Sequence, residues 1–120
     1  MITEIKARLE TLGYVAKSED DAFISFVLDK TNERIKIFTN QSIVPDELKY
    51  EVIDAVASEF MLAKLATNGL DVERAVQSIT EGDTTVSFAN GSDSASLLKR
   101  YYDSLELDYT KLIKYRVMAW

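Results

Sequence analysis

The sequence predicts a mainly α-helical protein, a small bundle of about four to five helices with one short β-hairpin inserted before the C-terminal helices. Apolar residues recur every three or four positions over most of the chain, which is the spacing of one face of an α-helix. One proline and four glycines leave few positions that would interrupt a helix. The 120 residues suit a single core, so we expect residues 1–120 to form one domain.

The first two helices are indicated by their apolar spacing and by the residues at their ends. The first apolar series stops at Gly13, and glycine commonly lies just beyond a helix end. The second helix is expected to begin at Ser18, whose hydroxyl can cap it. The expected buried faces consist of Ile2, Ile5, Leu9 and Leu12 in the first helix and Ile24, Val27, Leu28, Ile35 and Phe38 in the second.

Three adjacent carboxylates, Glu19, Asp20 and Asp21, stand in the first turn of this second helix. They could offer oxygen ligands to a metal ion. Acidic residues are, however, also favoured at this position by the positive end of the helix dipole. We interpret them as solvated first-turn residues, and the sequence therefore predicts no metal and no cofactor.

The third helix is expected to begin at Pro45 and to stop at the Asn68-Gly69 pair. Nine of the twelve residues from Ala55 to Ala66 are apolar, so the apolar surface wraps most of this helix. Such a helix must be buried nearly all round. It can lie at the centre of its own bundle, or one face, with Phe60 and Met61, can pack against another subunit.

A short hairpin is expected over Val76–Phe88, with its turn at Glu81, Gly82 and Asp83. Glycine can adopt the positive φ of a tight turn, and aspartate can bond to its own backbone. An isolated hairpin is only marginally stable in water. It would therefore either cap its own helices or contact a neighbouring molecule, and its apolar contact residues would be Ile79, Val86 and Phe88.

The C-terminal part is expected to hold a fourth helix, with apolar residues from Leu97 to Leu105, and a short final helix starting near Asp108. The tail that follows is apolar and basic, whereas chain ends are normally polar. It would either fold back on the core or dock on a partner. The candidate docking residues are Tyr109, Tyr115, Arg116, Val117, Met118 and Trp120.

The chain has no cysteine and no histidine. Disulfides, thiolate metal sites and cysteine or histidine catalysis are thereby excluded. Phosphate-binding, dinucleotide-binding and nucleophile-elbow motifs are also absent from the sequence. The one enzymatic alternative is a carboxylate pair, Glu81 and Asp83, but carboxylates at a turn ordinarily serve turn chemistry and solubility. We therefore expect a protein that is not an enzyme.

The net charge of −6 argues against a protein that binds nucleic acid, because such binding depends on basic residues that neutralise phosphates. The charge is uneven: residues 97–120 carry +2 and the rest of the chain carries −8. No apolar run approaches the roughly 18 residues of a membrane span, and the N-terminus lacks the basic and apolar regions of a signal peptide. We expect neither secretion by signal peptide nor contact with a membrane.

The chain resembles the head-tail connector proteins of long-tailed bacteriophages and prophages, which are also called head-completion or adaptor proteins. The resemblance rests on the ordered combination of three segments. They are VIDAVASEFMLAKLA (Val52–Ala66), SITEGDTTVSF (Ser78–Phe88) and LIKYRVMAW (Leu112–Trp120).

The resemblance implies a non-enzymatic structural adaptor that forms a ring, commonly of about twelve subunits, under the portal of the capsid. Such a ring would extend the DNA channel, let DNA pass without specific binding, and dock a stopper or tail-completion protein. The segment Tyr109–Trp120 would contact the portal protein. The protein would be made in the bacterial host cytoplasm and would lie at the head-tail interface of the virion.

A different class of function is also compatible with the sequence. A small acidic helical protein could act as a regulator by binding a host or phage protein. That alternative predicts a dimer and a partner unrelated to capsid assembly.

Overall fold

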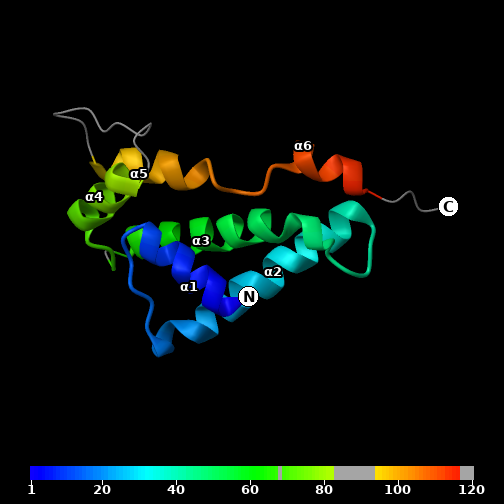
Figure 1. Cartoon of the computed structure of the whole chain (residues 1–120), viewed down its shortest axis with the longest axis horizontal. Coiled ribbons are helices and arrows are strands. Elements are labelled where there is room, and N and C mark those ends of the chain that lie inside the picture. Colours follow the sequence, from blue (N-terminus) through cyan, green and yellow to red (C-terminus); the bar gives the residue numbers. More distant parts are fainter. Residues whose placement is uncertain (68, 83–93, 117–120) are drawn as a thin grey trace.

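A computed structural model describes residues 1–67, 69–82 and 94–116, and in these segments the protein is helical and has no strand (Figure 1). The prediction of a mainly α-helical bundle is confirmed. The α-helices are α1 (Ile2–Thr11), α2 (Asp21–Thr39), α3 (Lys49–Ala66), α4 (Val72–Gly82), α5 (Ser94–Asp103) and α6 (Tyr109–Leu112). Short 3-10 helices at Ser18–Asp20, Asp46–Leu48 and Ile113–Tyr115 adjoin α2, α3 and α6.

The ends of α2 and α3 follow from local sequence. The 3-10 turn that starts at Ser18 leads directly into α2, and α2 ends at Asn40 in the left-handed conformation, with φ at 54°. Asparagine tolerates this conformation better than most residues, so it can terminate a helix as glycine does. Pro45 precedes the 3-10 turn that leads into α3, and the α-helix proper begins only at Lys49.

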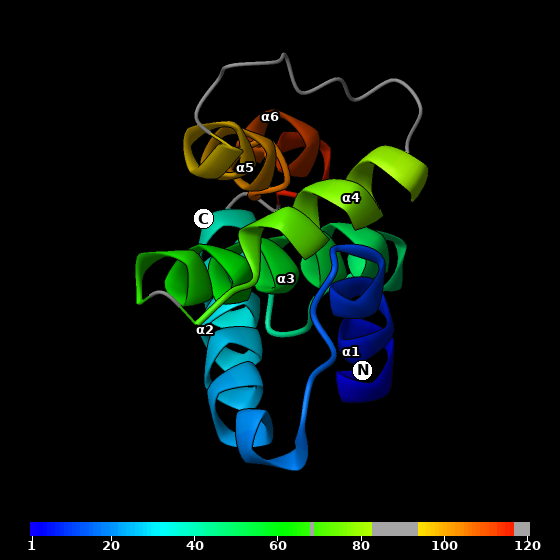
Figure 2. The same ribbon diagram turned by 90° about the vertical axis from the view of Figure 1, so that its left-hand side faces the viewer.

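Helix α3 occupies the centre of the molecule. Helices α1 and α2 lie side by side against one face of α3, and α5 lies against the opposite face (Figures 1 and 2). Phe60 and Met61 are completely buried among these helices, so the expectation that they pack against a second subunit is corrected. The other interpretation, a central helix in its own bundle, is the arrangement observed. The fully covered α3 side chains include Val52, Val56, Ala57, Phe60 and Met61.

The expected hairpin is not present in the part of the chain that the structure describes. Residues 76–82, its first strand and most of its turn, form the second half of α4 instead. Val72, Ala75, Val76 and Ile79 recur at helical spacing, and Ala75 and Ile79 are buried in the core. The burial of this stripe explains why a helix forms here. Its start is capped by the Asp71 carboxylate, which accepts a hydrogen bond of 3.2 Å from the backbone N–H of Arg74.

The C-terminal helices lie along the face of α3 opposite α1 and α2 (Figure 1). Leu98 and Tyr102 are fully buried on the inner side of α5, and Leu112 is fully buried on the inner side of α6. Helix α6 begins after Asp108, as predicted. The Asp108 carboxylate accepts a 3.0 Å hydrogen bond from the backbone N–H of Thr110 and so caps the helix.

A search of the described helices for a membrane span found none of sufficient length and apolarity.

Gly13 permits the close contact between the end of α1 and α4. Its φ is +93°, and a Cβ atom at this position would lie 2.7 Å from the Cα of Ala75. Gly13→Ala should therefore destabilise the fold by about 1–2 kcal/mol or more, because it adds backbone strain to a backbone clash. Chemical denaturation measures this change. Gly69→Ala is the matched control, since the nearest atom to a Cβ there is a flexible Lys64 side-chain carbon at 3.3 Å; an equal loss in both variants would contradict the prediction.

Tyr102 is fully buried, and its hydroxyl has no hydrogen-bond partner among the described residues. Burial raises the pKa of this hydroxyl well above its ordinary value of 10.0. An unpaired buried hydroxyl costs about 1 kcal/mol or more. Tyr102→Phe should therefore keep or raise the free energy of unfolding, whereas Ser58→Ala should lower it, because the Ser58 hydroxyl donates a 2.6 Å hydrogen bond to the Tyr102 carbonyl. Urea denaturation of both variants tests this, and a marked loss of stability in Tyr102→Phe would contradict it.

Candidate functional site

The candidate docking residues at the C-terminus divide into two groups. Tyr109, Tyr115 and Arg116 are placed against the end of α2, whereas Val117, Met118 and Trp120 lie outside the described residues. Of the described three, Tyr109 and Arg116 are exposed and Tyr115 is half-buried. We refer to residues 109–116 as the C-terminal arm.

Three contacts hold the C-terminal arm on α2, and two of them involve Phe38. The centres of the Phe38 and Tyr109 rings lie 4.9 Å apart, and the Arg116 guanidinium lies 5.6 Å from the centre of the Phe38 ring. Both are geometries in which aromatic and cation–π attraction contribute. In addition, the Gln41 side-chain amide donates a hydrogen bond to the carbonyl of Tyr115. The arm is thus fixed at both of its ends.

Exposed apolar side chains gather at the same end of the molecule. Ile37 and Ile43 are 78% and 73% exposed, and Ile113 of the C-terminal arm is 58% exposed. Ile37 and Ile43 are within a few residues of Phe38 and Gln41, to which the arm is attached. Sequence reasoning missed both residues. Ile37 lies outside the predicted buried face of α2, and this position could have indicated an exposed apolar side chain. We refer to Ile37, Ile43, Ile113, Lys114 and Arg116 as the arm end.

The residues that were expected to form a hairpin contact do not form one exposed group. Ile79 is only 2% exposed and packs in the core. Glu81 and Gly82 form the last turn of α4. Asp83, Val86 and Phe88 lie outside the described residues. The apolar contact assigned to Ile79 is therefore made within the chain itself.

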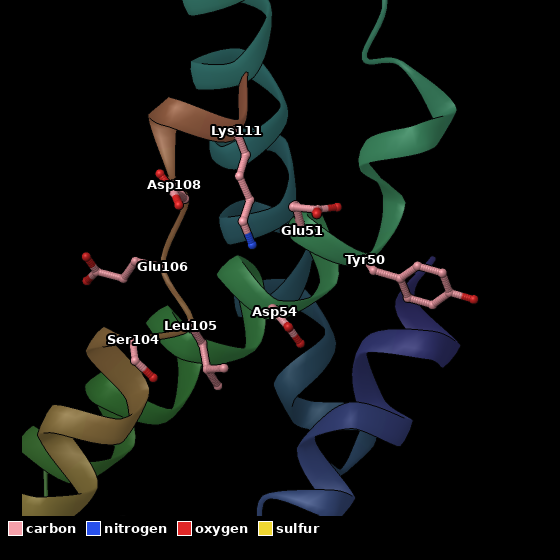
Figure 3. Close-up of a pocket in the computed structure, with 8 residues that line it drawn as sticks. All are labelled: Tyr50, Glu51, Asp54, Ser104, Leu105, Glu106, Asp108 and Lys111. Atoms are coloured by element: carbon pink, nitrogen blue, oxygen red, sulfur yellow. The ribbon is translucent and has the colours of Figure 1, made fainter. Parts of the chain in front are cut away.

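A groove of about 320 Å³ lies between α3 and the segment that joins α5 to α6 (Figure 3). Lys111 reaches from α6 toward α3, while the Tyr50 ring points out of the groove toward α1 (Figure 3). Tyr50 is 73% exposed. Sequence reasoning missed this groove, which brings together residues that are more than fifty positions apart. Its lining consists of Tyr50, Glu51, Asp54, Ser104, Leu105, Glu106, Asp108 and Lys111.

The charge in the groove is mainly negative. The Asp54 carboxylate lies 2.8 Å from the Arg8 guanidinium, and the Asp108 carboxylate caps α6. Hydrogen bonds from the Thr110 hydroxyl and backbone N–H hold the pKa of Asp108 below its ordinary value. Glu51 and Glu106 form no salt bridge with any described residue within 4.0 Å. The arrangement suits contact with a cationic group.

The three carboxylates at the start of α2 are directed to different partners. Asp20 is buried, accepts a 3.0 Å hydrogen bond from the Tyr14 hydroxyl, and lies 3.4 Å from the Lys64 ammonium. The Asp21 carboxylate lies 2.5 Å from the Lys6 ammonium, and Glu19 is exposed. No group of three potential metal ligands occurs among the described residues. The prediction that these residues are all solvated was therefore wrong for Asp20.

Comparisons with models of protein families, with curated proteins and with solved structures found no match to this chain.

Asp20 should make the stability of the fold sensitive to acid. Burial by itself would raise the pKa of Asp20, but hydrogen bonds from the Lys17 backbone and the Tyr14 hydroxyl and the nearby Lys64 ammonium hold it below 3.8. A carboxyl with a lowered folded-state pKa contributes stability above its unfolded pKa and loses it as the pH falls through the folded pKa. The free energy of unfolding should therefore fall below about pH 4.

Asp20→Asn should lower stability at neutral pH and flatten its fall below about pH 4, because the titrating group has been removed. Glu19→Gln is the control, since Glu19 is exposed and adjacent. Thermal denaturation between about pH 2 and 7 measures both profiles. An acid profile for Asp20→Asn that matches that of the wild type would contradict the assignment.

Proposed function

We propose that this chain is a non-enzymatic structural adaptor of the head-tail connector kind. It would assemble with copies of itself under the portal protein of a phage capsid and dock there by its C-terminal end. The next stopper or tail-completion protein would bind the other side of the assembly. The mainly helical fold and the resemblance of the three sequence segments both support this proposal.

The observation that carries the proposal is the anchoring of the C-terminal arm. Tyr109 and Arg116 are fixed on Phe38, and Gln41 binds the backbone at Tyr115. Arg116 is exposed and has an extended backbone, with φ at −73° and ψ at 127°. Arg116, the residue before Val117, is therefore held at the surface of one end of the molecule. A segment that follows an anchored residue loses less entropy on binding than one that follows a free residue.

The composition of this tail suits a protein contact. Methionine, tryptophan and arginine are enriched at interfaces, and tryptophan is among the residues that most often dominate their binding energy. The net charge of −6 is also compatible with an adaptor whose channel DNA crosses without adhering, because like charges repel.

Removal of residues 117–120 should abolish binding to the portal protein that the proposal names as partner and leave the helical fold intact. Trp120→Ala should weaken the binding about tenfold or more, because a buried aromatic anchor is lost. Surface plasmon resonance with immobilised portal measures the affinity, and circular dichroism measures helix content. The control is Val15→Ser, at a residue that is 54% exposed in the connection between α1 and α2.

Unchanged portal binding after removal of the tail would contradict the proposal. A loss of helix content would instead show that the tail belongs to the core. A stable dimer that ignores the portal would favour the alternative of a small acidic regulator.

A further inference from the structure

An apolar depression lies between α1 and α3, on the other side of Tyr50 from the groove described above. It has a volume of about 480 Å³, and its apolar lining comes from Ala7, Tyr50 and Ile53. Tyr50 is 73% exposed and lines both hollows. We refer to Ala7, Tyr50, Ile53, Glu51 and Glu106 as the Tyr50 surface. An exposed tyrosine beside an apolar hollow is typical of the centre of a protein interface.

The charges that line this depression are paired, and the unpaired negative charge lies in the adjoining groove. Glu4 is paired with Lys49 at 2.6 Å and Asp54 with Arg8 at 2.8 Å, so these charges largely cancel. In the adjoining groove, Glu51 and Glu106 have no salt-bridge partner among the described residues, and Lys111 is the one basic residue of the lining, so the groove stays negative overall. A binding partner would therefore match the surface best if it carried apolar groups beside positive charge.

The arm end has this complementary character. Ile37, Ile43 and Ile113 are all more than half exposed. Beside them, the Lys114 ammonium lies 5.2 Å from the centre of the Tyr115 ring, and the Arg116 guanidinium lies 5.6 Å from the centre of the Phe38 ring. Among the described residues, neither cation has a carboxylate within 4.0 Å. One region of the chain thus presents apolar groups with free negative charge and another presents apolar groups with free positive charge.

The depression beside Tyr50 and the arm end are on different sides of the molecule. The depression is formed by α3 with α1, whereas the C-terminal arm is attached to the end of α2. Both α1 and α2 lie against the same face of α3, with α1 to the right and α2 to the left in Figure 2. Contact between the two regions would therefore join one copy to the next rather than close within a single copy.

We propose that the Tyr50 surface of one copy binds the arm end of a second copy. This inference rests on the proposed function and names the contact between neighbouring subunits. Because the two partner surfaces differ, the contact is head-to-tail, and repeating it yields a closed ring if the rotation between copies closes. Part of the attraction is between exposed charges, so assembly should weaken as salt is raised.

Reversal of the charges on either surface tests the contact. The first variant carries Glu51→Lys and Glu106→Lys, and the second carries Lys114→Glu and Arg116→Glu. Each alone should lose self-association by about tenfold or more at low salt, because like charges now face each other. An equal mixture should regain it, because each reversed surface again meets its opposite. Sedimentation velocity of the full chain measures the association, and circular dichroism confirms that both variants fold.

Tyr50→Ala should also weaken association, with Phe26→Ala as the matched control, since Phe26 is 61% exposed on α2 and belongs to neither surface. Wild-type chains that stay monomeric at the highest soluble concentration would overturn the inference, as would reversed variants that associate like the wild type or a mixture without recovery. Portal binding by the intact tail is measured separately, so this contact can fail while the proposed function stands.

Discussion

The fold depends on the burial of α3 from both sides. Apolar side chains surround this helix, and water would have access to one face of it if either covering layer were missing. Helices α1 and α2 cover one face and α5 covers the other, while α4 fills the corner between α1 and α5. Gly13 permits the close contact of α1 with α4, and the Ser58 hydroxyl ties α3 to the carbonyl end of α5. Together these contacts allow a single chain to surround its own central helix.

This arrangement determines which surfaces remain for function. Since the apolar surface of α3 is covered within the chain, association has to use exposed residues at the start of α3 and on the covering helices. Tyr50 is exposed at the start of α3 and lines two hollows, one between α3 and α1 and one between α3 and the α5–α6 connection. The C-terminal arm lies at the end of α2 and is fixed there through Phe38. A stable core with opposite charge on two separate edges is a physically reasonable basis for a protein that acts by assembly.

Sequence patterns predicted the elements whose signals are local. The start of α6 follows from its capping residue Asp108, and the long α3 follows from proline and apolar spacing. The start of α2 lies close to Ser18 as predicted, but Ser18 is inside the 3-10 turn and the predicted Ser18 cap does not form. Residues 76–82 were wrongly predicted as a strand and a turn. The helical series of apolar residues begins earlier, at Val72, and a prediction that starts at Val76 takes Gly82 for the centre of a turn. The tilted ring contact of Tyr109 with Phe38 could not be predicted, because it joins residues about seventy positions apart. The same holds for the hollows beside Tyr50, whose walls come from helices far apart in the sequence.

The central claim is that the chain folds as one self-sufficient unit and assembles through the Tyr50 surface and the arm end, without using the buried side chains of α3. Hydrogen exchange measured across a wide range of protein concentrations tests it most directly. The account predicts that protection of the buried middle of α3, Ala55–Met61, is independent of concentration, whereas protection around Tyr50 and the arm end rises as copies associate. Protection of α3 that collapses on dilution would contradict the account, because the central helix would then need a second subunit to cover it.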